Sequence, residues 1–148
     1  MIEANEITIP VPAHHVWRVF ADVERWPEWT ASITRLTFAE GDEIAVGSAV
    51  RIKQPRFPEL TWRVTDVDPG ASWTWVTTSP GATTSAVHVL ERVDATTTRV
   101  TQRIEQRGPI GGLVGRLARG TTRRYLAMEA EGLRRRCEAT WDAGATSA

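Results

Sequence analysis

Three polar side chains, His88, Gln102 and Tyr125, are the candidates for chemistry in this sequence. The imidazole of His88 suits acid–base work because its ordinary pKa lies near neutrality. The amide of Gln102 can orient a bound molecule, and a buried Tyr125 hydroxyl must find a hydrogen-bond partner. If all three face one apolar space, they can hold a small molecule or move protons on it. His88 and Tyr125 are the predicted catalytic residues.

The strand patterns place Gln102 inward but leave the direction of His88 open. Successive side chains alternate across a strand, so Gln102 shares a face with Val100. In the segment 84–93, one face carries His88 and Leu90, and the other carries three valines. We interpret the His88 face as inward because of Leu90, although the opposite choice is almost as good. A single inward histidine is also compatible with ordinary core packing.

Other kinds of site are not indicated by the sequence. His14 and His15 are adjacent, so on a helix they point in different directions and do not form a metal-binding pair. The glycines between Gly108 and Gly115 match neither a P-loop nor a dinucleotide-binding fingerprint. We therefore expect no metal site and no cofactor.

Bulky apolar residues would supply the walls of the expected space. Seven tryptophans against one tyrosine favour either an aromatic core or an aromatic-walled cavity. Alternation in the segments 49–54 and 60–67 puts apolar side chains on one face, and Arg51 and Arg63 on the other. Packing in a solid core is the alternative explanation for the tryptophans and for Met128. The predicted ligand-binding residues are Trp29, Val50, Ile52, Trp62, Val64, Trp75, His88, Gln102, Tyr125 and Met128.

A regular order of predicted elements positions these residues. Alternating patterns predict strands, and prolines or glycines separate them. Pro12 and Pro27 each favour the start of a short helix, and Asp68-Pro69-Gly70 favours a turn. The predicted strands are 2–9, 33–38, 49–54, 60–67, 73–78, 84–93 and 98–105, and the predicted helices are 13–23, a short one near 27, and 109–139.

The last predicted helix is the longest element. Its apolar residues recur at helical spacing in two rows, which predicts burial along most of its length. Because both rows need burial, and because the net charge is zero, a membrane-surface or protein-docking role for this arginine-rich helix is the weakest functional hypothesis. The first row consists of Ile110, Val114, Leu117, Thr121, Tyr125 and Met128.

Composition limits the number of domains and the class of partner. A chain of 148 residues fits one domain, which we place at 1–141, with a flexible polar tail at 142–148. Zero net charge argues against binding to nucleic acid, and no apolar run is long enough for stable membrane insertion. The single cysteine, Cys137, lies on the helical stripe and is expected to be buried. We expect a cytoplasmic monomer or homodimer, since the acidic N-terminal segment is not a signal peptide.

Several short motifs give the chain a resemblance to a known superfamily. They are Ile9-Pro10-Val11-Pro12-Ala13, Val16-Trp17, Asp22-Val23, Trp26-Pro27-Glu28-Trp29, Asp68-Pro69-Gly70, Thr98-Arg99-Val100-Thr101 and Gly108-Pro109. With them the chain resembles START-like (SRPBCC) proteins, particularly the polyketide cyclase/dehydrase-like branch, over nearly its whole length. The resemblance implies an α+β helix-grip fold. In that fold a curved antiparallel seven-stranded sheet wraps a long C-terminal helix around a deep apolar cavity, and two short helices follow the first strand.

The resemblance implies two functions. The first is binding of a hydrophobic, aromatic or polycyclic small molecule in the cavity between the sheet and the C-terminal helix. The alternative is a cofactor-free polyketide aromatase/cyclase or dehydratase, in which His88 moves protons and Tyr125 donates a hydrogen bond. Enzymes of that kind are expected to have a pocket arginine, whereas Arg51 and Arg63 fall on the outward faces here. This departure favours the binding function.

Overall fold

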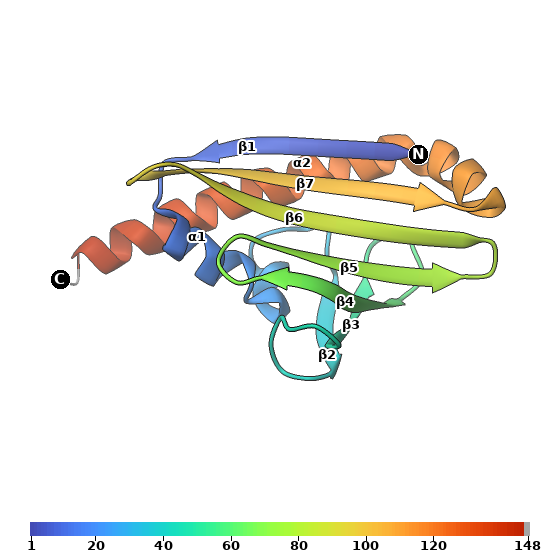
Figure 1. Cartoon of the computed structure of the whole chain (residues 1–148). Helices are drawn as coiled ribbons and strands as arrows, with labels where there is room; N and C mark the ends of the chain where they lie inside the picture. The colour runs from blue at the N-terminus through green and yellow to red at the C-terminus, as the bar shows by residue number, and fades with distance from the viewer. Residues whose placement is uncertain (147–148) are drawn as a thin grey trace.

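One antiparallel sheet, two α-helices and a 3₁₀ helix make up residues 1–146, which are the residues that the computed structural model describes (Figure 1). The sheet has seven strands in the order β1-β7-β6-β5-β4-β3-β2. The elements are β1 (Ile2–Ile9), α1 (Ala13–Phe20), the 3₁₀ helix η1 (Val23–Glu28), β2 (Arg35–Glu40), β3 (Ala49–Lys53), β4 (Leu60–Asp68), β5 (Ser72–Ser79), β6 (Ala82–Asp94), β7 (Thr97–Arg107) and α2 (Pro109–Thr146).

The long helix α2 runs across one face of the sheet, and α1 and η1 lie near the end of the sheet closer to the C-terminus (Figure 1). Helix α2 packs against β1, β6, β7 and α1. Register shifts within the β2–β3, β4–β5 and β6–β7 pairs add the local twist and bending that let the sheet curve around the helix. The predicted helix-grip fold is therefore confirmed.

Alternation along the strands sorts side chains as the sequence predicted. On β4, Trp62 and Val64 are buried, whereas Arg63 is exposed and pairs with Glu40 at 2.9 Å. On β6, His88 is only 2% exposed, so its face is the inward one. The central strands thus present an apolar, aromatic concave face with a few polar side chains among them.

The start of α2 is fixed by the neighbouring β5–β6 hairpin. Gly108 has a φ of 96°, a conformation that favours glycine, and its bend directs the chain into the helix. The backbone N–H groups of Ile110 and Gly111 then donate to the carbonyl oxygen of Gly81. These bonds satisfy two of the N–H groups that a helix leaves without an intrahelical partner, and they hold the first turn beside the hairpin.

Two expectations about α2 are wrong. The helix extends to Thr146 rather than ending near 139, so residues 142–146 of the predicted tail are helical, and residues 147–148 lie outside the described chain. Burial along most of the helix is also wrong at its N-terminal end, where Leu117 is 80% exposed and Ile110, Leu113 and Val114 are exposed as well. This end of α2 lies over the mouth of the cavity described below, which Ile110 and Val114 line, rather than over a solid core. In the described chain no helix is long and apolar enough to cross a membrane.

The remaining boundaries differ by a few residues. The first helix ends at Phe20 rather than at 23, and the residues around Pro27 form a 3₁₀ helix. Strand β2 begins at Arg35, two residues later than predicted. Cys137 is fully buried, and burial raises the pKa of its thiol to about 12, so it packs as a small apolar residue.

Candidate functional site

A cavity of about 300 Å³ lies between the concave face of the sheet and α2. Its inner end is formed by buried side chains, including Trp26, His88 and Glu129. Its outer end is formed by exposed side chains, including Pro80 of the β5–β6 hairpin and Ile110 of α2. The cavity therefore opens where the hairpin meets the start of α2, far from the C-terminus in Figure 1.

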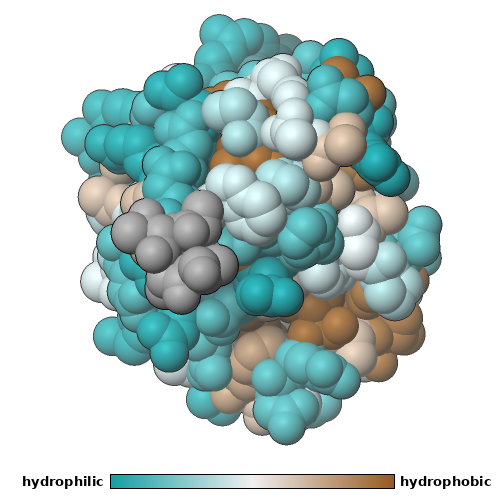
Figure 2. Space-filling model, turned by 90° about the vertical axis from the view of Figure 1, so that its left-hand side faces the viewer, coloured by the Kyte–Doolittle hydropathy of each residue, from teal (hydrophilic) through white to brown (hydrophobic). Residues whose placement is uncertain are grey.

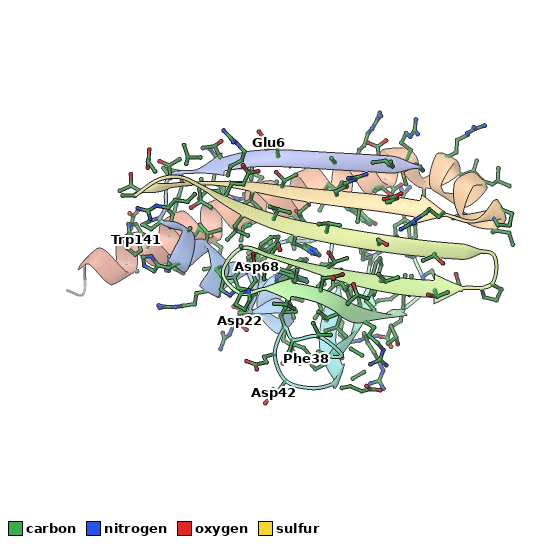
Figure 3. The ribbon with its side chains drawn as sticks, viewed as in Figure 1. Glu6, Asp22, Phe38, Asp42, Asp68 and Trp141 are labelled. Atoms are coloured by element: carbon green, nitrogen blue, oxygen red, sulfur yellow. The ribbon has the colours of Figure 1, made fainter. Side chains whose placement is uncertain are left out.

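The opposite end of the molecule looks different. Figure 2 views the protein from the side on which the C-terminus lies, and this face is mainly hydrophilic, with hydrophobic residues gathered toward its lower right. Figure 3 places Trp141 at this end, beside α1. Its ring lies 5.4 Å from that of His15, which also bonds to Thr140 at 2.7 Å. These contacts close the C-terminal end of α2 onto α1.

Several predicted site residues do line the cavity. Their side chains come from β3, β4, β5, β6, β7 and α2, so the curved sheet and the helix together bring them to one space. Contact with a ligand stays a prediction for each of them. They are Ile52, Trp62, Trp75, His88, Gln102 and Tyr125.

Four predicted ligand-binding residues are not in the cavity wall: Trp29, Val50, Val64 and Met128. Val50 and Val64 face inward as predicted, but they lie in the solid part of the core. Trp29 instead packs beneath α2 at Gly132, where an added Cβ would overlap its carbonyl oxygen.

Trp26 takes the place that the sequence reasoning gave to Trp29. It is 1% exposed, stacks on Phe20 with a centroid distance of 5.3 Å, and donates its indole N–H to the Phe20 carbonyl oxygen. Trp26 lies within η1, whereas Trp29 follows it as the C-cap with a φ of −128°, and the two ring centroids are 5.3 Å apart. Both tryptophans belong to the same motif, and the sequence pattern alone does not distinguish which of them lines the cavity.

His88 lies inside an aromatic cluster. Its ring stacks on Trp73 at 4.2 Å with an interplanar angle of 13°, and it also contacts Phe20, Trp26 and Trp75 edge-on. Burial among these rings lowers the pKa of His88 to about 3, and the bond to the Trp73 carbonyl opposes this only in part. The imidazole is therefore neutral at pH 7. The ordinary pKa on which the acid–base role of His88 was predicted does not apply in this environment.

The tautomer of His88 follows from its one hydrogen bond. Nδ1 lies 3.2 Å from the carbonyl oxygen of Trp73, and a carbonyl can only accept. Nδ1 therefore carries the proton and Nε2 keeps its lone pair. His88 can offer an acceptor to the cavity but no proton.

Glu129 is the functional candidate that the sequence reasoning missed. It lines the cavity and is 6% exposed. One carboxyl oxygen accepts from the Ser32 hydroxyl at 3.0 Å, and the other accepts from the Gln102 amide at 3.2 Å. Burial raises the pKa of Glu129 to about 7, and the bonds from Ser32 and Gln102 lower it by less. A titrating acid thus lies at the inner end of the cavity.

The sequence reasoning missed Glu129 for a geometric reason. At about 100° per residue, the helix face that lines the cavity is centred roughly 65° from the predicted row. It shares Ile110, Val114 and Tyr125 with that row, but has Ala118 in place of Leu117 and Glu129 in place of Met128. Of the lining residues outside the predicted row, Gly111, Ala118, Thr122 and Glu129 are small or polar, and Leu126 is apolar. The lining residues of α2 are Ile110, Gly111, Val114, Ala118, Thr122, Tyr125, Leu126 and Glu129.

Tyr125 is tied to the opposite wall. Its hydroxyl donates to the carbonyl oxygen of Pro55 in the β3–β4 connection, and its ring meets Phe57 edge-on at 5.9 Å. This bond uses the hydroxyl proton, and it links α2 to the β3–β4 connection in this structure. A catalytic role for Tyr125 would require this bond to break.

A second hollow, of about 310 Å³, is lined by residues of α1, η1, β2 and the loop that follows β2. Figure 3 shows Asp22, Phe38 and Asp42 in the lower part of the view, around the edge strand β2. Glu24 of this hollow accepts from the backbone N–H of Phe38 at 3.2 Å. Within residues 1–146, no group of His, Cys, Asp or Glu side chains is arranged to hold a metal ion.

Comparison with known proteins agrees with this geometry. Residues 4–138 match the model of the family described as polyketide cyclase / dehydrase and lipid transport. The chain belongs to this family. No curated protein sequence matches it.

Solved structures with the same fold include characterised and uncharacterised proteins. The Zhui aromatase/cyclase of a Streptomyces species is 18% identical, with a TM-score of 0.76 and 93% of each chain covered. A START superfamily protein of Mycobacterium smegmatis is 16% identical, with a TM-score of 0.72, covering 94% of this chain and 98% of the other. The di-domain ARO/CYC BexL is 21% identical, with a TM-score of 0.69. Here the match covers 90% of this chain but only 46% of BexL.

Proposed function

We propose that this family member binds a hydrophobic, aromatic or polycyclic small molecule in the cavity between the sheet and α2. The observation that carries the proposal is the cavity itself, with about 300 Å³ of space walled by Trp62 and Trp75 and ended by Trp26. Ligand pockets in proteins begin at about this volume and combine apolar walls with a few polar groups. Indole faces offer stacking surfaces to a flat ring, which supports an aromatic ligand.

The expected affinity for a simple probe is modest. Naphthylmethanol, with about twelve non-hydrogen atoms, would gain roughly 6 kcal/mol at about 0.5 kcal/mol per atom, a value inside the range that small ligands reach. That corresponds to a dissociation constant of tens of micromolar. A natural ligand that also satisfies the polar groups should bind more tightly.

Titration of tryptophan fluorescence with naphthylmethanol tests the proposal. Ala86 is 4% exposed and lines the cavity, so Ala86→Leu fills space there while keeping an apolar strand residue. This variant should lose most of the affinity. Ala127→Leu, on the exposed face of α2, is the matched control and should bind as the wild type does. Equal binding by folded Ala86→Leu would reject the cavity as the site.

Catalysis is the second candidate, because Glu129 has a pKa of about 7 and lies in the cavity. A group with that pKa can donate or accept a proton near neutrality, which general acid–base catalysis of cyclisation or dehydration needs. His88, with its pKa near 3, is poorly suited to that role, and Arg63 points outward to Glu40. With a poly-β-ketone substrate, Glu129→Gln should lower turnover by about 10²–10⁴-fold. His88→Gln should change it much less if Glu129 moves the proton.

A further inference from the structure

Five hydrogen-bond donors of the cavity wall are already used by the protein. Tyr125 donates to the Pro55 carbonyl, and Thr77 donates to the Thr61 carbonyl at 2.8 Å. The protonated Nδ1 of His88 donates to the Trp73 carbonyl. In the same way the Trp26 indole donates to Phe20, and an amide proton of Gln102 goes to Glu129. These bonds occupy the five donors, so they are not directed at a ligand in this structure.

Acceptors, in contrast, remain. Each carboxyl oxygen of Glu129 has two lone pairs and accepts one bond, from Ser32 or from Gln102. The Nε2 atom of His88 keeps its lone pair. The Oε1 atom of Gln106, another cavity-lining residue, is buried and accepts no hydrogen bond from the described residues. These acceptors can bind a molecule that brings donors of its own.

The charges of the lining residues further limit the chemical class of the ligand. The described residues that line the cavity include no lysine or arginine, and Glu129 is their one carboxylic acid. The indole faces of Trp26, Trp62 and Trp75 also attract cations. An anionic ligand would meet no opposite charge, whereas an ammonium group would meet the carboxylate and the aromatic walls.

We propose that the ligand is a hydrophobic aromatic amine, bound as its ammonium ion with Glu129 as the counter-charge at the inner end of the cavity. This inference rests on the proposed binding function and specifies its ligand class. The bonds from Ser32 and Gln102 to the two carboxyl oxygens hold the carboxylate in place for the ammonium group. Thr30 extends this arrangement through its 2.8 Å bond with Ser32.

The pH dependence of binding follows from Glu129. Of the other titratable groups on the cavity wall, His88 on β6 is neutral throughout the range considered, and the Tyr125 hydroxyl on α2 is bonded to Pro55. The segment that carries Ser32 and the strand that carries Gln102 bring only uncharged groups to Glu129. With a Glu129 pKa of about 7, its ionised fraction rises roughly 30-fold between pH 5.5 and pH 8. Affinity for an amine that stays protonated should rise by about the same factor.

Calorimetric titration with naphthylmethylamine and naphthylmethanol, a pair that differs in the polar group, tests the inference. The amine should bind more tightly than the alcohol at pH 8, and its affinity should rise with pH while that of the alcohol changes little. Glu129→Gln should weaken amine binding at pH 8 on the order of 10- to 100-fold and alcohol binding by much less, because the alcohol carries no charge. Glu131→Gln is the control, because Glu131 lies on the same helix and pairs with Arg134 outside the cavity.

The outcomes separate the two proposals. If neither probe binds the wild type, the binding function fails and this inference fails with it. If the alcohol binds as tightly as the amine, or if amine affinity does not rise with pH, the ammonium proposal is wrong while the binding function stands. The wild-type pH profile decides the matter even if Glu129→Gln does not fold, and Glu129→Met provides a second variant without the carboxyl group.

Discussion

Replacing Glu129 with glutamine should change how stability depends on pH. Burial raises the pKa of Glu129 from 4.5 to about 7, so the unfolded chain releases this proton at lower pH than the folded protein does. Folding stability therefore falls as pH rises from about 4.5 to 7, because the folded state binds more protons in this window. At about 1.4 kcal/mol per pKa unit, the total loss is about 3 kcal/mol.

His88 acts in the opposite direction. Its pKa is lowered from 6.5 to about 3, so its contribution to stability is fully present above pH 6.5 and is lost as pH falls toward 3. Between about pH 4.5 and 6.5 the two slopes oppose each other, and the wild type should have a nearly flat stability curve there. Glu129→Gln keeps the shape of the side chain and removes only one of the slopes.

Urea unfolding, followed by tryptophan fluorescence from pH 4 to pH 8, measures this difference. Relative to the wild type, Glu129→Gln should gain about 3 kcal/mol of unfolding free energy between pH 4.5 and pH 7. Its stability should rise with pH up to about 6.5. Glu131→Gln, which changes an exposed carboxylate on the same helix, should follow the wild type. Parallel curves for Glu129→Gln and the wild type would refute a buried, protonated Glu129.

Two further predictions concern the aromatic wall. Trp75→Ala should weaken binding of naphthylmethanol and also cost about 3–5 kcal/mol of stability. Calorimetric affinity and thermal unfolding must therefore be measured together. Unchanged affinity in a folded variant would show that Trp75 does not contact the ligand. His88→Gln should flatten the stability curve between pH 3 and 6.5, since glutamine does not titrate there. If urea unfolding shows that the variant loses as much stability in acid as the wild type does, this prediction is wrong.

The sequence was sufficient for the fold because each strand carries its own pattern. Alternation around Trp62 and Arg63 assigned both faces of β4, and Asp68-Pro69-Gly70 marked the turn into β5. The parity argument also put Gln102 inside, where it is buried. These are local signals, since strand side chains alternate whatever the partner strands are.

The site depended on features that such patterns do not report. The rotation of α2 about its axis is set by the surface it packs on, and apolar residues alone pointed to Met128 rather than Glu129. Ala118 and Thr122 lie in line with Tyr125 and Glu129 at helical spacing, and these small and polar residues were the available signal for Glu129. Similarly, the pKa of His88 depends on Trp73, Trp75 and Phe20, which converge only in the folded chain.

A crystal structure with a brominated naphthylmethylamine tests the central claim most directly, because anomalous scattering locates the bromine without ambiguity. The account predicts one bromine site between the sheet and α2, beside Trp62 or Trp75, with the amine nitrogen within hydrogen-bond distance of Glu129. A bromine site in the cavity with the amine turned toward the mouth would keep the binding function and reject the role of Glu129. Bromine found only on the outer surface, at a concentration that saturates binding in solution, would contradict the account.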